Sequence, residues 1–105
     1  MRGIIWYKNK ENGFERMQSI MHGYNKMGIN IVEVRRYKEE IIAVYENKDV
    51  WRCIPVNKNR RGPRANISLI ERSIDREVIN QVILPKTILP PYNVYGFYGE
   101  DCEDE

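Results

Sequence analysis

Four basic side chains gather in one short, turn-rich segment, and their chemistry suits a phosphate-bearing ligand. Within the stretch NKNRRGPR they are Lys58, Arg60, Arg61 and Arg64. A planar guanidinium group presents paired donors that match phosphate oxygens. Gly62, between them, lets main-chain N–H groups approach an anion closely. The segment therefore predicts a phosphate-binding loop, with a solvated connector between two strands as the alternative.

Other aromatic and basic residues could complete such a site. Trp51 precedes the loop, and nucleobases stack on aromatic faces, although core packing is an alternative role for this ring. Arg35 and Arg36 end another predicted strand, and alternation turns them to opposite faces, so one of them could contact phosphate from a second subunit. A chain this short often builds its site between subunits, and we expect a homo-oligomer.

Residues that usually carry catalysis are few and scattered. His22 is the only histidine, and Cys53 and Cys102 are far apart, which does not make an ordinary zinc site. The best-spaced acids are Glu71 and Asp75, and capping of a following helix also explains them. We therefore expect no catalytic centre, no metal and no cofactor.

Charge is distributed unevenly along the 105 residues, a length that fits one domain. The chain has 17 basic and 15 acidic residues, and five of the acids lie in residues 100–105, so residues 1–99 carry 17 basic against 10 acidic residues, a net charge of +7. We expect residues 1–99 to form one domain and residues 100–105 to be a disordered acidic tail. A basic domain favours anionic partners, including nucleic acid.

The chain has no apolar run near the length of about 20 residues that spans a membrane. Residues 1–10 also lack the apolar core of a signal peptide, and two isolated cysteines suit a reducing compartment. We expect a cytoplasmic protein without membrane contact.

The elements that would position these residues follow from hydrophobic periodicity. Residues 3–7 are predicted to form a buried strand, and a helix is predicted from a cap at Asn12 to a left-handed Gly28. Short polar turns then separate strands over residues 29–37, 41–45 and 50–56, which predicts an antiparallel meander. Pro55 should lie at an edge or at a strand end, because it has no N–H to donate.

After the basic segment, residues 65–71 read as a strand. A second helix capped by Ser73 or Asp75 is expected to bury Ile74, Val78, Ile79, Val82 and Ile83. Residues 88–98, rich in proline and tyrosine, are expected to form an extended aromatic arm. The predicted fold is α+β: an antiparallel sheet of about five strands with two helices packed on it, in the order β-α-β-β-β-β-α.

One stretch, residues 40–71, resembles the Walker B region of phage terminase large subunits. A strand hairpin is followed by Arg61-Gly62-Pro63-Arg64-Ala65 and by an apolar run ending at Glu71. In that family an arginine-glycine loop precedes an apolar strand ending in Asp-Glu, which holds magnesium and activates water. Here Arg72 stands in place of the catalytic glutamate, and no G-x-x-x-x-G-K-[ST] loop is present. The resemblance therefore implies a remnant without ATPase activity.

Over its whole length the chain looks like small uncharacterised proteins of Gram-positive phages and prophages. The similarity rests on RGIIWY at residues 2–7, ANISLIERSID at 65–75 and PPYNVYGFYGE at 90–100. Some compact phage proteins of this size sequester the cyclic nucleotide signals of bacterial immunity. By that analogy the chain would act in the host cytoplasm as an anti-defence protein.

Three functions remain open from the sequence. The first is non-catalytic binding of a phosphate-bearing ligand, such as a cyclic nucleotide, at the basic loop. The second is a nucleic-acid-binding accessory protein, whose acidic tail competes with the nucleic acid. The third is a protein–protein inhibitor of a host defence or packaging enzyme.

Overall fold

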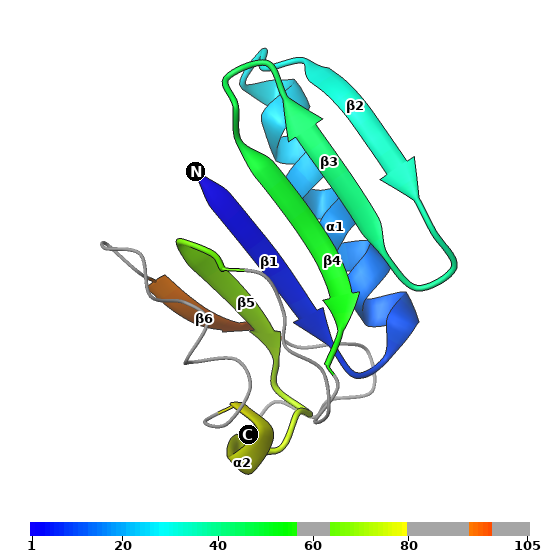
Figure 1. Cartoon of the computed structure of the whole chain (residues 1–105), viewed down its shortest axis with the longest axis vertical. Coiled ribbons are helices and arrows are strands. Elements are labelled where there is room, and N and C mark those ends of the chain that lie inside the picture. The colour runs from blue at the N-terminus through cyan, green and yellow to red at the C-terminus, as the bar shows by residue number, and fades with distance from the viewer. Residues whose placement is uncertain (57–63, 80–92, 98–105) are drawn as a thin grey trace.

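A computed structural model of the chain describes residues 1–56, 64–79 and 93–97 (Figure 1). Six strands form one mixed sheet in the order β2-β3-β4-β1-β5-β6. The elements, in chain order, are β1 (Arg2–Tyr7), α1 (Lys10–Lys26), β2 (Ile31–Arg36), β3 (Ile41–Tyr45), β4 (Val50–Pro55), β5 (Ile67–Glu71), α2 (Arg76–Val78) and β6 (Asn93–Phe97). The predicted α+β class and the order of the first seven elements are confirmed.

The sheet has an antiparallel half and a parallel half. β2, β3 and β4 form the predicted meander, with Pro55 at the end of β4 as expected. β1, however, runs parallel to both of its neighbours, β4 and β5, and β5 runs parallel to β6. The prediction of an antiparallel sheet was therefore wrong for this half. Residues 56–66, between β4 and β5, are long enough to return the chain to the other end of the sheet, as a parallel connection requires.

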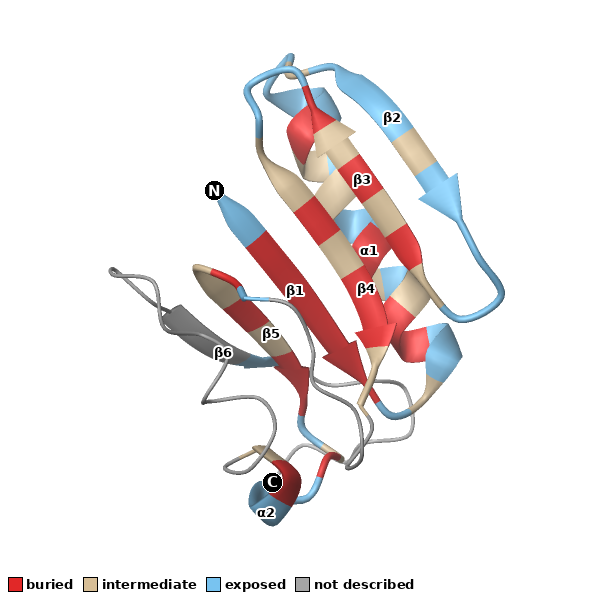
Figure 2. Cartoon of the chain, viewed as in Figure 1, coloured by how far each residue is buried: buried red, intermediate tan, exposed pale blue. Residues whose placement is uncertain are grey.

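β1 is one of the two central strands and is buried on both faces. Its alternate side chains Ile5 and Tyr7 join a cluster beneath α1, whereas Ile4 and Trp6 join a second cluster on the opposite face. Figure 2 shows buried residues, in red, running along this strand and its neighbours. Full burial of each large apolar side chain stabilises the fold by about 1.5–3 kcal/mol. β1 therefore ties the two layers together.

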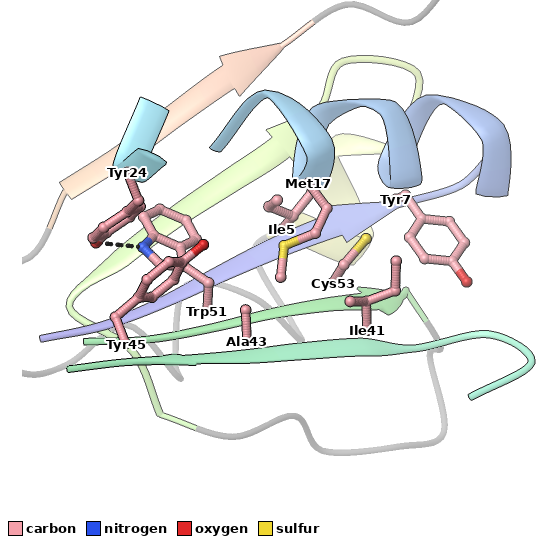
Figure 3. Close-up of a cluster of buried hydrophobic side chains, with 9 residues drawn as sticks. All are labelled: Ile5, Tyr7, Met17, Tyr24, Ile41, Ala43, Tyr45, Trp51 and Cys53. Carbon is pink, nitrogen blue, oxygen red and sulfur yellow. Dashed lines mark hydrogen bonds between the residues drawn. The ribbon is translucent and has the colours of Figure 1, made fainter. Parts of the chain in front are cut away.

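The cluster beneath α1 is drawn in Figure 3. α1 lies across one face of the sheet, and buried side chains on it meet residues from β1, β3 and β4. The members of the cluster are Ile5, Tyr7, Met17, Tyr24, Ile41, Ala43, Tyr45, Trp51 and Cys53. The opposite cluster contains Ile74 and Val78, so α2 packs on the other face.

The sequence predicted the end of α1 correctly but placed its beginning at the wrong residue. Gly28, just after α1, has the expected positive φ of 77°. The N-cap of α1 is Asn9 instead of Asn12, because the Asn9 side chain accepts a hydrogen bond from the Glu11 N–H at 3.0 Å. Asn12 is buried inside the first turn of the helix.

The second predicted helix is described only in part. Ile74 and Val78 are buried as expected, and Asp75 is the N-cap of α2 without a side-chain capping bond. Val82 and Ile83 fall outside the described residues, as do the parts of the predicted arm that flank β6. None of the helices in the described part of the chain is long and apolar enough to cross a membrane.

Candidate ligand-binding edge of the sheet

Three neighbouring strands, β4, β1 and β5, run in the same direction and end at one edge of the sheet, which we call the carboxyl edge (Figure 1). Lys8 follows β1 directly and Arg72 follows β5 directly, and both are exposed. β4 leads into the segment 57–63, and the Val56 N–H donates to the Tyr7 carbonyl at 2.9 Å. Basic residues therefore follow β1 and β5 directly at this edge, and in the sequence Lys58 is the first basic residue after β4.

This edge is also where the direction of the chain connections reverses. From β1 the chain passes through α1 toward the β2–β4 side of the sheet, whereas from β5 it continues through α2 to β6 on the other side. The two helices pack on opposite faces. In open sheets, ligands bind beyond the carboxyl ends of parallel strands at such a reversal. A ligand site in a sheet of this topology would therefore lie between the ends of β1 and β5.

A buried carboxylate, Glu71, occupies that position. Its Oε1 accepts hydrogen bonds from the main-chain N–H groups of Lys8 at 2.8 Å and Asn9 at 2.9 Å. Its Oε2 accepts one from the Asn12 side-chain amide at 2.9 Å. The residue is 1% exposed. Glu71 therefore joins the end of β5 to the beginning of α1.

The charge state of Glu71 follows from these bonds. Burial disfavours the carboxylate and acts to raise its pKa, but hydrogen bonds from Asn9, Asn12, Lys8 and Ser73 outweigh burial, and the pKa lies below its usual value. Glu71 is therefore an internal anion at neutral pH. It holds the N–H groups of the β1–α1 turn, so a bound phosphate would depend on side-chain cations around the edge.

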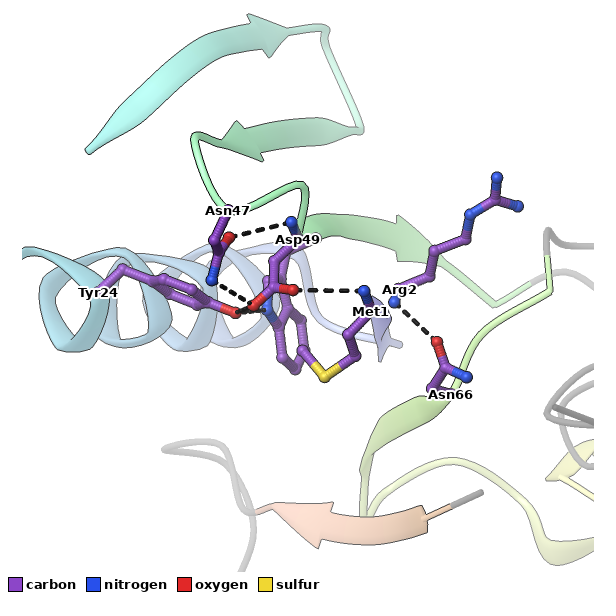
Figure 4. Close-up of polar contacts among 7 residues, drawn as sticks. Met1, Arg2, Tyr24, Asn47, Asp49 and Asn66 are labelled. Carbon is purple, nitrogen blue, oxygen red and sulfur yellow. Dashed lines mark hydrogen bonds and ion pairs between the residues drawn. The ribbon is translucent and has the colours of Figure 1, made fainter. Parts of the chain in front are cut away.

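The predicted basic loop is only partly within the described structure. Lys58, Arg60, Arg61 and Gly62 lie outside the described residues. Arg64 is described and exposed, and it belongs to the opposite, amino edge of the sheet. There the Asn66 N–H donates to the Arg2 carbonyl at 2.8 Å, and the Arg2 N–H donates to the Asn66 side chain at 2.9 Å (Figure 4). The described ends of the segment, residues 56 and 64, are thus at opposite edges.

Trp51 is a core residue. It is 4% exposed, and its indole N–H donates to the Tyr24 hydroxyl at 2.9 Å (Figure 3). The ring also lies so close to Gly3 that a Cβ there would be 2.6 Å from its carbons. We therefore correct the sequence interpretation and assign Trp51 to the core instead of to base stacking.

Arg35 and Arg36 are exposed on β2, at the far margin of the sheet. Four strand spacings separate β2 from β5, or about 19 Å. Arg35 pairs with Glu33, with 3.2 Å between Nε and Oε1. β2 runs in the same direction as β4 and ends at the same edge, so within one chain these arginines are separated from β1 and β5 by distance across the sheet and not by the edge at which they lie.

The amino edge carries a separate polar network (Figure 4). The Tyr24 hydroxyl donates to Asp49 at 2.7 Å, and the Asn47 amide donates to the same carboxylate oxygen at 3.1 Å. The amino group of Met1 lies 3.3 Å from the other oxygen. Burial, and then the bond to Asp49, raise the pKa of Tyr24 to about 12. This network anchors the end of α1.

The described residues offer little for nucleophilic or metal chemistry. Burial raises the pKa of Cys53 to about 12, so its thiol stays protonated. His22 is exposed on α1. No group of three or more His, Cys, Asp or Glu side chains is placed to hold a metal ion within the described ranges.

Sequence reasoning missed Lys8 and Arg72 as candidate site residues, and it considered Glu71 as a capping residue and as the counterpart of the Walker B aspartate. Residues directly after strands were a usable signal, but the assumed antiparallel order would have placed the ends of neighbouring strands at opposite edges. Comparison of the chain with protein-family models, with curated proteins and with solved structures found no match in any of the three.

Proposed function

We propose that this protein is a non-catalytic binding protein for a phosphate-bearing ligand, such as a cyclic nucleotide, which it holds at the carboxyl edge. The observation that carries the proposal is that three neighbouring parallel strands end together, and in the sequence each is followed by basic residues. Lys8 and Arg72 are the described members of this set, and Lys58, Arg60 and Arg61 are its members in the segment after β4.

The chemistry of binding would be charge-assisted hydrogen bonding to phosphate oxygens. Arginine provides a fork of donors and lysine a point charge. Glu71 contributes indirectly: by holding the N–H groups of Lys8 and Asn9, it fixes the main chain from which the Lys8 side chain projects. Lys8 and Arg72 follow adjacent strands about 4.8 Å apart, but the Arg72 side chain lies against Gly96 of β6, away from β1. A ligand with two linked phosphate groups would therefore bridge Lys8 and Arg72 across the end of β5.

Isothermal titration tests this proposal with a cyclic dinucleotide, a linear dinucleotide and a nucleoside monophosphate as ligands. Replacing Lys8, Arg61 or Arg72 by alanine should raise the Kd of a bound ligand about tenfold or more, because each change removes a charge-assisted bond. Mass spectrometry of the ligand after incubation should find it unchanged.

Arg64→Ala and Arg36→Ala are matched controls, because these exposed arginines lie at the amino edge and on β2. Each should change the Kd less than about twofold. Thermal unfolding of every variant shows that the fold is retained. The proposal is wrong if none of the three ligands binds, or if the two control changes weaken binding as strongly as Lys8→Ala does.

A salt series separates this reading from the nucleic-acid alternative. The accessory-protein function would be favoured if an oligonucleotide binds and the logarithm of its affinity falls steeply and linearly with the logarithm of the salt concentration. It would also require that substitutions at the carboxyl edge weaken this binding no more than those at Arg64 or Arg36. That outcome would replace the small-ligand proposal.

A further inference from the structure

β2 forms one margin of the sheet, and no described element covers its outer side (Figure 1). Figure 2 shows it exposed along nearly its whole length. Val32 is 67% exposed, and Tyr37, just beyond the strand, is 54% exposed. A margin of this kind offers unpaired main-chain groups to another strand.

The hydrogen-bonding direction of the β2 main chain can be assigned from its turn. The Tyr37 N–H donates to the Glu40 carbonyl at 2.8 Å, so it points inward to β3. Main-chain groups alternate in direction along an antiparallel strand. The main-chain N–H and C=O groups of Arg35 therefore also point inward to β3, whereas those of Val34 point outward from the sheet. The register irregularity of β2 lies before Glu33, so it leaves this alternation intact.

The side chains of β2 alternate between the two faces of the sheet. Val34 packs against the cluster beneath α1. Glu33 and Arg35 consequently project from the opposite face, where their charged groups are 3.2 Å apart. Both are exposed. Along β2, an acidic and a basic side chain thus flank Val34, the residue whose main-chain groups point outward from the sheet.

We propose that β2 pairs antiparallel with β2 of a second copy of this chain, about a twofold axis at Val34. The N–H of each Val34 then donates to the carbonyl of the partner's Val34. On the exposed face, Glu33 lies opposite the partner's Arg35, and Arg35 lies opposite the partner's Glu33. These are non-hydrogen-bonded pairs, in which the side chains of antiparallel strands approach most closely.

The charge pattern selects this register over its neighbours. An axis at Glu33 would place two glutamates opposite each other, and an axis at Arg35 would place two arginines opposite each other. Like charges directly opposite are destabilising, whereas opposite charges stabilise the pairing. An isologous contact about a twofold axis also closes after two copies and does not propagate. The chemistry of the strand therefore specifies a dimer with a defined register.

The proposal concerns the β2 margin and is independent of ligand binding at the carboxyl edge. It also gives Arg35 a role at a subunit interface that differs from phosphate contact. A variant that dissociates the dimer leaves Lys8 and Arg72 unchanged, so the two proposals can fail separately.

Sedimentation equilibrium over a range of protein concentrations tests the dimer. The unaltered chain should be dimeric, and Glu33→Arg or Arg35→Glu should each raise the dimer Kd roughly tenfold or more, because two opposite-charge pairs become like-charge pairs. The double variant, Glu33→Arg with Arg35→Glu, restores opposite charges in the same register. Its dimer Kd should return to within about threefold of the original.

Glu15→Arg, an exposed charge reversal on α1, is the matched control and should leave the dimer intact. Circular dichroism shows that each variant is folded. The midpoint of thermal unfolding measures how much stability is lost with the ion pair between Glu33 and Arg35 within one chain. A chain that is monomeric at all concentrations overturns the proposal. So does a dimer that resists both single reversals, or one that the double reversal does not restore.

Discussion

The two ends of α1 are anchored to the sheet by carboxylates, but the two anchors differ in burial and in partners. At the beginning of α1, Glu71 is 1% exposed and its bonds go to two main-chain N–H groups and a buried amide. At the end of α1, Asp49 is partly exposed and bonds to the Tyr24 hydroxyl and to Asn47. The first anchor organises the main chain of the carboxyl edge, whereas the second holds two side chains and the amino group of Met1. Substitutions near the beginning of α1 should therefore lower the free energy of unfolding more than substitutions near its end.

Replacing Glu71 should have the largest effect. Glu71→Ala leaves the buried Asn12 amide and two main-chain N–H groups without their acceptor, and hydrogen bonds to charged groups contribute about 1.5–3 kcal/mol each. We expect the free energy of unfolding to fall by about 3 kcal/mol or more in urea titrations. Glu15→Ala, an exposed glutamate on α1, is the control and should change stability by less than about 0.5 kcal/mol. Equal small effects for both would remove Glu71 as an anchor.

The same substitution, glycine to alanine, can be made near the beginning of α1 at Gly13 and near its end at Gly23, so it compares the two ends of the helix. A Cβ at Gly13 would lie 2.5 Å from the Tyr7 ring, whereas a Cβ at Gly23 would meet nothing within 4 Å. Gly13→Ala should therefore destabilise the fold by about 2 kcal/mol through overpacking. Gly23→Ala should stabilise it by up to about 1 kcal/mol, because alanine favours a helix more than glycine does. The Tm should therefore fall in Gly13→Ala and rise in Gly23→Ala. A shift of both Tm values in the same direction would contradict the proposed difference between the two ends of α1.

Removing one hydroxyl at the end of α1 should have a smaller effect than removing Glu71. Tyr24→Phe deprives Asp49 of a donor and the buried Trp51 N–H of its acceptor. We expect a loss of about 1.5 kcal/mol in the free energy of unfolding. Tyr37→Phe, at an exposed tyrosine, is the control and should be nearly neutral. A loss as large as that of Glu71→Ala would mean that the two anchors are equivalent.

Acid should weaken both anchors, with no effect near neutral pH. The pKa of Glu71 is lowered in the folded chain, so its contribution is fully present above the unfolded value of about 4.3 and is lost as pH falls through the folded pKa. Asp49 behaves with the same sign: burial opposes its ionisation, but bonds from Tyr24, Met1 and Asn47 lower its pKa. Urea titrations between pH 7 and pH 3 should therefore show a smaller acid slope for Glu71→Gln than for the unaltered chain. An unchanged slope would show that Glu71 does not supply this pH dependence.

Local signals in the sequence predicted much of the fold. The meander follows from short polar turns, Gly28 from the need for a positive φ, and Pro55 from its missing N–H. These features depend on residues close together in the chain. The parallel position of β1 depends instead on pairing with residues about 50 and 65 positions away, which periodicity does not report.

The same distinction explains the candidate site. A basic cluster is visible in sequence, but the bond from Asn12 to Glu71 joins residues 59 positions apart and has no local signature. Trp51 was considered for stacking because it precedes the basic segment in the chain, yet alternation along β4 turns its ring under α1. Lys8 and Arg72 became candidates only once β1 and β5 were known to end at the same edge.

Amide chemical-shift mapping during nucleotide titration tests the central claim, that the carboxyl edge binds a phosphate-bearing ligand. With a cyclic dinucleotide as the probe, we predict the largest shifts at the amides of Lys8, Asn9 and Arg72, and none at Arg35 or Arg36 on β2. The absence of saturable shifts with cyclic, linear and mononucleotide probes would contradict the account. Shifts confined to Arg2 and Asn66 at the amino edge would contradict it equally.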